Sequence, residues 1–220
     1  MEHLYKTDDI GTLAAAANLC LLISIGLCPP TQELAQGLGD GSFFGDYVDS
    51  LRALSREGMQ DISYAVRAYM GREAEAIFTE LNREYTRLFV SPKRELVPLY
   101  ESLIVHPGEK VSMFINQTVM HCEQVYRKAG FAFEEKNKFP GDHAGIELRF
   151  FACLLARRAM ALEAGNEEEA KAAGAVLNDF ATQHLARWTG KFAEQVMLYT
   201  QSPFYALLAD TLGQLTAVEG

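Results

Sequence analysis

Two polar side chains in the second half of the sequence stand one helical turn apart. His143 and Glu147 would share a face of a helix, where both could ligate one metal ion. Known helical metal sites need more donors, because a di-iron bundle uses two Glu-x-x-His pairs and a zincin uses His-Glu-x-x-His. None of the five histidines follows a glutamate by three residues, and the zincin motif is absent. A helical metal-binding protein that uses these two residues is therefore an alternative and not the main hypothesis.

Phosphate-binding and nucleophilic motifs are missing from the sequence. The glycine-rich segment 37–45 lacks GxGxxG spacing, no strand pattern precedes it, and no segment matches GxxxxGK[ST]. The four cysteines form no CxxC pair and lie in apolar stretches, so we interpret them as reduced core residues. They are Cys20, Cys28, Cys122 and Cys153. Because no nucleophile and base can be paired from these motifs, we expect no enzymatic activity and no cofactor.

The elements that position these residues follow helical periodicity. Apolar residues recur every three or four positions in 73–89 and again in 111–129, which predicts two amphipathic helices. The segment 146–155 is apolar on two faces and predicts a central helix packed on both sides. Further helices are expected at 10–28, 167–181, 185–199 and 204–218. With no strand alternation, we predict an all-α, single-domain helical bundle of about eight or more helices over residues 1–220.

Helix boundaries and loops follow from capping residues, proline and glycine. Asp142 is expected to cap the central helix, with Pro140 fixing the approach of the chain. His143 then has no capping task, which favours recognition or a loop-pinning hydrogen bond. The segment 90–110 holds three prolines and is expected to be a long, functional loop, and 37–45 a flexible connection.

Charge and hydropathy limit the classes of partner. The net charge of −9 repels phosphate backbones, so we expect no nucleic acid and prefer a cationic partner. The apolar run 10–28 is nearly long enough to span a bilayer. Its small residues, Asn18 and the acidic residues before it indicate a buried first helix instead. We therefore expect a cytoplasmic protein with no stable membrane insertion.

Three separated segments resemble one protein family, the molybdoenzyme maturation chaperones of the TorD/DmsD/NarJ type. The first comprises EYTRLF at 84–89 and PLYES at 98–102. The second is PGDHAGIELRFFACLL at 140–155. The third comprises HLARW at 184–188 and SPFYALLADTL at 202–212. Together their order and spacing extend over about the last two-thirds of the chain, which is far more specific than any one string.

The resemblance implies a cytoplasmic, all-helical chaperone without catalytic residues. Such a protein binds the twin-arginine leader, or a related N-terminal segment, of a molybdopterin-containing oxidoreductase subunit and delays its export until the cofactor is inserted. Homodimers occur in the family and are possible here. A general acidic adaptor that binds some other basic protein is the remaining alternative.

The peptide-binding residues implied by the motifs come from the first two segments. They are Tyr85, Leu88, Phe89, Pro98, Tyr100, Glu101, Ser102, Pro140, Asp142, His143 and Glu147. The three from 84–89 could line a groove for the apolar part of the leader, although a helical stripe is ordinarily core. Glu101 could pair with a leader arginine, because guanidinium and carboxylate form bidentate hydrogen bonds. The client enzyme, the oligomeric state and any binding of guanine nucleotide or molybdopterin are left open by the sequence.

Overall fold

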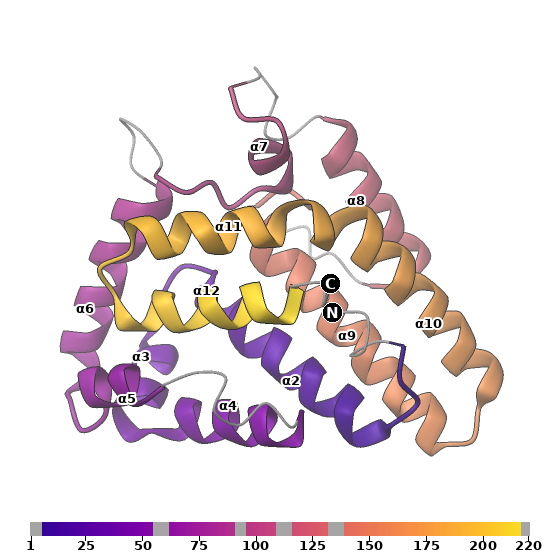
Figure 1. Ribbon diagram of the computed structural model, residues 1–220, viewed down its shortest axis with the longest axis horizontal. Coiled ribbons are helices and arrows are strands. Elements are labelled where there is room, and N and C mark those ends of the chain that lie inside the picture. Colours follow the sequence, from indigo (N-terminus) through magenta and orange to yellow (C-terminus); the bar gives the residue numbers. More distant parts are fainter. Residues whose placement is uncertain (1–5, 55–61, 91–95, 109–115, 132–138, 217–220) are drawn as a thin grey trace.

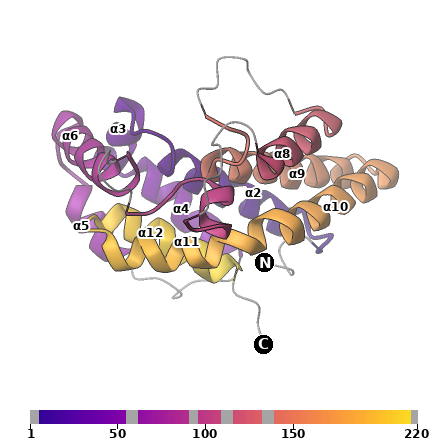
Figure 2. The same cartoon turned by 90° about the horizontal axis from the view of Figure 1, so that it is seen from above.

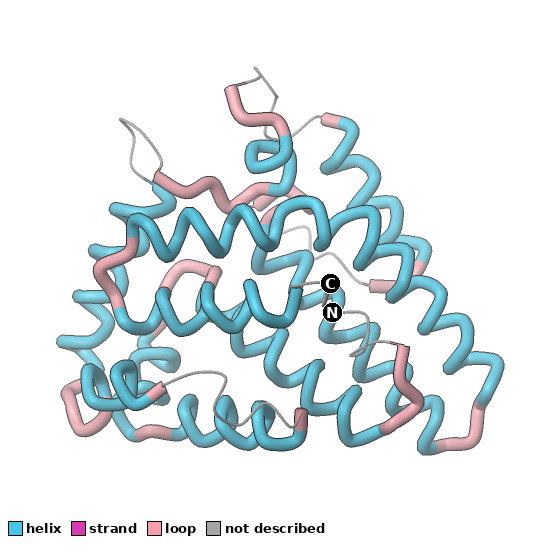
Figure 3. Tube along the Cα trace, viewed as in Figure 1, coloured by secondary structure: helices cyan, strands magenta, loops and turns pink. Residues whose placement is uncertain are grey.

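The computed structural model describes residues 6–54, 62–90, 96–108, 116–131 and 139–216. The first half contains α2 (Ile10–Gly26), α3 (Gln32–Asp40), α4 (Ser42–Ala53), α5 (Ser63–Tyr69), α6 (Ala74–Tyr85), the π-helical segment η1 (Thr86–Val90) and α7 (Glu101–Val105). The second contains α8 (Gln117–Lys128), α9 (Ala144–Glu163), α10 (Glu167–Phe180), the π-helical segment η2 (Ala181–Leu185), α11 (Ala186–Tyr199) and α12 (Pro203–Thr216). No strand occurs in these ranges (Figure 3), which confirms the all-helical prediction.

Helices α2 and α9 pack along each other at the centre of the molecule, and α10 covers another side of α9. Helices α11 and α12 form an adjacent pair at the front of Figure 1. Figure 2 shows α3, α5 and α6 at one end and α8, α9 and α10 at the other. One hydrophobic cluster runs from Leu13 on α2 to Leu215 on α12. The predicted central helix with two apolar faces is therefore confirmed as α9.

The apolar N-terminal segment forms a buried helix, as expected. The side chain of Asp9 accepts a hydrogen bond from the amide of Thr12 at 2.7 Å and caps α2. The side chain of Thr31 likewise caps α3 after the two prolines that follow α2. No helix in the described residues combines the length and apolar character that a membrane span requires.

Two segments expected to be loops are partly helical. The glycine-rich segment 37–45 belongs to α3 and α4, which are separated only by Gly41 at a φ of 87°. That left-handed conformation suits glycine. The chain therefore leaves the helical conformation at Gly41 alone, whereas the four glycines of the segment had suggested a longer flexible connection. The segment 90–110 contains α7, because residues 101–105 close a helical turn against the start of α9. The predicted start of α8 lies partly in residues 109–115, outside the described residues.

Helices α10 and α11 are joined by η2 without a loop, so residues 167–199 form one long helical rod with a π-helical turn. A π-helical turn rotates the helix face by one extra residue and is frequent at functional sites. Here η2 contains His184, which is buried. The rod passes beside α7, which packs against α11. The local change of helix type therefore occurs where the motif-bearing segments meet.

Candidate functional site

The PLYES and PGDH segments are joined by backbone hydrogen bonds. The amide of Glu101 donates to the carbonyl of Asp142 at 2.9 Å, and the amide of Ala144 donates to the carbonyl of Leu99 at 2.8 Å. An isolated antiparallel bridge pairs Tyr100 with His143. Two motifs 40 residues apart in sequence thus form one rigid unit, which fixes α7 to the first turn of α9.

The expected capping roles of Asp142 and His143 are wrong. Asp142 does not cap α9, because its Oδ2 accepts the amide of Ser102 at 3.1 Å and so caps α7. His143 is the capping residue of α9, and its Nδ1 accepts the amide of Gly145 at 3.1 Å. Burial, followed by the charge of Arg149, lowers the pKa of His143 to about 4, which keeps the imidazole neutral and able to accept.

A buried polar cluster lies directly beneath α7. Glu101 is completely buried, and its Oε2 lies 2.6 Å from His184 Nδ1. The thiol of Cys122 lies 3.3 Å from the same ring nitrogen and 4.0 Å from Oε2. On the other side, Arg187 Nη1 forms an ion pair with Glu101 Oε1 at 3.1 Å. We call these four residues the Glu101 cluster; they come from α7, α8, η2 and α11.

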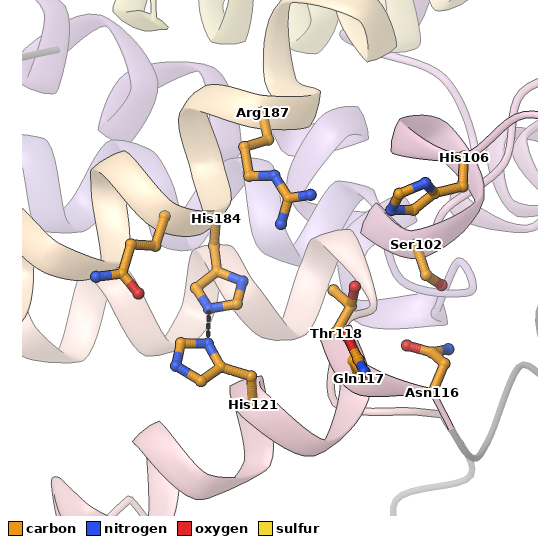
Figure 4. A pocket seen from close by; sticks show the side chains of 9 residues that line it. Ser102, His106, Asn116, Gln117, Thr118, His121, His184 and Arg187 are labelled. Atoms are coloured by element: carbon orange, nitrogen blue, oxygen red, sulfur yellow. Dashed lines mark hydrogen bonds between the residues drawn. The ribbon is translucent and has the colours of Figure 1, made fainter.

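Two imidazoles connect the Glu101 cluster to the surface. His184 Nε2 lies 2.8 Å from Nδ1 of His121, and the two rings stack with their centroids 4.9 Å apart. Figure 4 shows this hydrogen bond between η2 and α8, with Arg187 projecting into the same space. His121 is exposed, and its pKa is lowered by partial burial and then by the neighbouring His184. A chain of hydrogen-bonding groups therefore extends from a buried carboxylate to solvent.

Two further buried carboxyl groups surround Cys122. Glu147 is completely buried and accepts a hydrogen bond from Trp188 Nε1 at 2.8 Å. Burial raises the pKa of Glu147 well above its usual range, and Glu101 raises it further. Burial also raises the pKa of Asp142, although the hydrogen bonds from Ser102 oppose that shift. In the described residues, Glu147 Oε1 and Asp142 Oδ1 lack a hydrogen-bond partner.

Replacing Glu147 with Gln is expected to stabilise the protein at neutral pH. A carboxyl group whose pKa is raised by folding favours the folded state below its unfolded pKa of about 4.3, and this contribution is lost as pH rises towards the folded pKa. Glutamine stays neutral and its oxygen still accepts from Trp188. We expect wild type and variant to be similar near pH 4.5 and the variant to be more stable by about 1–3 kcal/mol near pH 7.5.

Chemical denaturation at the two pH values measures this difference. Glu163→Gln is the matched control, because Glu163 is exposed on the last turn of α9 and should give no pH-dependent gain. Equal effects of Glu147→Gln at both pH values would show that the carboxyl is ionised in the folded protein or that its burial has no energetic cost.

A pocket of about 830 Å³ opens beside the Glu101 cluster, between α7, α8 and the η2–α11 segment (Figure 4). Its lining residues all have polar side chains and are Ser102, His106, Asn116, Gln117, Thr118, His121, Gln183, His184 and Arg187. A smaller pocket of about 280 Å³ shares His121, Gln183 and His184 with it. The smaller pocket adds apolar side chains from α8 and α10, among them Val125, Val176 and Phe180, together with one acidic and one basic residue, Asp179 and Lys128. The two pockets adjoin at His121, Gln183 and His184, and apolar side chains line part of the smaller one.

Most of the residues proposed from the motifs are buried and do not line this pocket. Nine of the eleven are buried: Tyr85, Leu88, Phe89, Glu101, Ser102, Pro140, Asp142, His143 and Glu147. Of these, Ser102 lines the large pocket. Pro98 and Tyr100 are partly exposed, and Pro98 lines a third pocket of about 590 Å³, which shares His106 with the large pocket. Phe89 packs edge-on against Tyr85 and Tyr205 in the core.

Sequence reasoning did not select the residues that line the pocket from α8, η2 and α11. His184 and Arg187 belong to the HLARW segment, so the motif itself was a usable signal for them. His121, Asn116 and Gln183 belong to no motif, and the structure alone brings them together.

The cysteine and metal interpretations also require revision. Cys20 and Cys122 are buried as expected, whereas Cys28 is partly exposed and Cys153 is exposed. Cys153 lies on the solvent side of α9, so the core interpretation is wrong for that residue. The two residues of the proposed metal pair have other partners: His143 accepts a hydrogen bond from the amide of Gly145, and Glu147 accepts one from Trp188. Among the described residues, the only group of three or more potential metal ligands is Glu101, Cys122 and His184.

Comparisons with known proteins agree with the motif resemblance and with the helical fold. The model of the protein family described as nitrate reductase delta subunit matches residues 52–194. A chaperone protein TorD from Vibrio parahaemolyticus is 27% identical over 177 residues, covering 80% of this chain and 73% of that protein. A crystal structure from Archaeoglobus fulgidus, provisionally assigned as a redox enzyme maturation protein, superimposes with a TM-score of 0.53 at 20% identity, covering 90% of this chain and 92% of that one. This last likeness concerns the fold and extends over nearly the whole molecule.

Proposed function

Because the chain belongs to the nitrate reductase delta subunit family, the group of TorD/NarJ-type redox enzyme maturation chaperones, we propose that it binds the twin-arginine leader of a molybdopterin-containing oxidoreductase subunit. In this proposal the chain acts in the cytoplasm, assists cofactor insertion and delays export until the client is mature. It binds and releases its client and catalyses no reaction.

The single observation that supports arginine recognition is that Glu101 is buried with one carboxylate oxygen that accepts no hydrogen bond from the described part of the chain. Its carboxylate is completely buried, yet its Oε1 already lies 3.1 Å from a guanidinium, that of Arg187. In the described residues this contact lacks hydrogen-bond alignment, so Oε1 retains its capacity to accept. A leader guanidinium that approaches through the pocket could form the aligned hydrogen bonds that Arg187 does not form.

A leader arginine would replace Arg187 at Glu101, and the exposure of Arg187 makes this replacement feasible. Its side chain is 41% exposed, and it lines the large pocket, so it can move into solvent without crossing the core. Once it moves, we expect the side of Glu101 that Arg187 contacts to become accessible from the pocket that Arg187 lines. Arg187 therefore occupies, in the free protein, the position that we assign to a leader arginine.

We assign the rest of the leader to the smaller pocket of about 280 Å³. The residues after the arginines of such a leader are apolar, and the smaller pocket offers Val125, Val176 and Phe180 between α8 and α10. The net charge of −9 further favours a cationic peptide over an anionic one. In this arrangement Asp142, His143 and Pro140 position α7 and its Glu101, and the core residues Tyr85, Leu88 and Phe89 hold the packing behind it.

Calorimetric titration with a synthetic leader tests this function. We expect the twin-arginine peptide to bind about tenfold or more tightly than a twin-lysine version of the same sequence, because ammonium cannot form the bidentate arrangement. Affinity should also fall as salt is raised. A peptide with the same composition in scrambled order is the control. Equal affinity for the arginine and lysine peptides would remove arginine recognition from the function.

A further inference from the structure

Three potential metal ligands meet in the Glu101 cluster. Glu101 Oε2, Cys122 Sγ and His184 Nδ1 belong to buried side chains from three different elements, and all three atoms lie within 4.8 Å of one another. Neither the motif resemblance nor the proposed leader site uses Cys122. From this geometry we propose that the protein binds one zinc-class divalent ion between Glu101, Cys122 and His184.

The ligand types select the ion. Imidazole nitrogen, thiolate sulfur and carboxylate oxygen together suit Zn²⁺, whereas Mg²⁺ and Ca²⁺ require mainly oxygen. Three protein ligands would leave the fourth tetrahedral position for water or for a donor from another molecule.

The distances are close to those of a tetrahedral site. Ligand atoms around tetrahedral zinc lie about 3.3–3.6 Å apart, from metal–ligand distances of about 2.0–2.3 Å. The thiol and the imidazole are 3.3 Å apart, and the thiol and the carboxylate are 4.0 Å apart. The imidazole–carboxylate distance of 2.6 Å is shorter, because these two atoms are joined by a hydrogen bond in the free protein. Binding therefore requires that this pair separate by less than about 1 Å.

Protons and tautomers are compatible with such binding. The ion would replace the thiol proton of Cys122, which leaves to solvent, and would require His184 Nδ1 to be unprotonated. His184 Nε2 would then carry the ring proton and donate it to His121 Nδ1, which lies 2.8 Å away. Imidazoles that bind metals commonly donate their second ring proton to an acceptor in this way, which fixes the ring.

Burial and solvent access also bear on the site. Glu101, Cys122 and His184 are buried, and Arg187 forms an ion pair with the Glu101 carboxylate. Oxygens of Glu147 and Asp142 have no hydrogen-bond partner within the described residues. The pocket that His184 lines gives the ion a path from solvent.

Cobalt(II) titration of the reduced, metal-stripped full chain tests the site, because a cobalt–thiolate bond produces a near-ultraviolet charge-transfer band. We expect one equivalent of cobalt to produce this band and one equivalent of Zn²⁺ to remove it. Cys122→Ser should abolish the band and weaken zinc binding by more than the roughly 10- to 100-fold that follows loss of a group hydrogen-bonded to a ligand. Cys153→Ser is the matched control and should change neither result, because Cys153 is exposed on α9.

A second variant covers the case in which Cys122→Ser does not fold. A chain with Cys20→Ala, Cys28→Ala and Cys153→Ser retains Cys122 as its sole cysteine. This chain should keep the full cobalt band. Absence of the band in the wild type, its persistence in folded Cys122→Ser, or its loss in the Cys122-only chain would each overturn the proposal. These outcomes are measured without leader peptide, and Cys122→Ser leaves Glu101 and Arg187 in place, so failure of the metal site and failure of leader binding are distinguishable.

Discussion

Glu101→Gln is expected to weaken leader binding by about 10- to 100-fold, the largest effect of any single change in the pocket. The substitution preserves shape and removes the negative charge, and a hydrogen bond to a charged group contributes about 1.5–3 kcal/mol. Because Glu101 is completely buried, little solvent competes for its carboxylate, and the loss should be near the upper end of that range.

Calorimetry with the twin-arginine peptide measures this loss. Glu163→Gln removes the same charge from an exposed position on α9 and should leave the affinity unchanged, which separates a local contact from the general acidic surface. Thermal melting of Glu101→Gln establishes that α7 is still folded. An affinity equal to that of the wild type, with a normal melting curve, would exclude Glu101 as the arginine acceptor.

Arg187→Gln should have two opposite effects. The free protein loses the cation that faces a fully buried carboxylate, so we expect it to be less stable by about 1–3 kcal/mol, a loss limited by the partial exposure of Arg187. The leader no longer displaces an internal guanidinium and should bind about tenfold more tightly. The rise in melting temperature on adding leader should therefore be larger in the variant than in the wild type.

Differential scanning fluorimetry with and without peptide measures both effects. Arg127→Gln, at an exposed position on α8, is the matched control and should show neither. If Arg187→Gln weakens binding instead, Arg187 contacts the leader directly and does not occupy the place of a leader arginine.

The fold was largely predictable because periodicity is a local property of the sequence. The segment 146–155 is apolar on two faces, one with Phe150 and one with Phe151. This pattern predicted that α9 packs on both sides, as observed. The glycine segment 37–45 was misjudged because glycine permits a turn without requiring one, and the packing of α3 against α6 and α4 kept most of it helical. Only Gly41 adopts the conformation that the segment suggested.

The site was less predictable because it depends on contacts between distant segments. Asp142 was assigned to the helix that it precedes, yet it caps α7, whose N-terminus is 41 residues earlier in the sequence. Glu101 and His184 are 83 residues apart and pair only because η2 turns His184 towards α7. No periodicity or spacing rule connects such positions. The motif segments meet around the Glu101 cluster, while the division into buried residues and pocket-lining residues required the structure.

The claim that Glu101 recognises a leader arginine is tested most directly by a double-mutant cycle across the interface. Wild type and Glu101→Gln are each titrated with the twin-arginine and twin-lysine peptides, and the four binding free energies give the coupling between the carboxylate and the guanidinium. We predict a coupling of about 1.5 kcal/mol or more, because the lysine peptide should lose little affinity when Glu101 is changed. Additive losses, with a coupling near zero, would contradict the account and show that the arginines bind elsewhere.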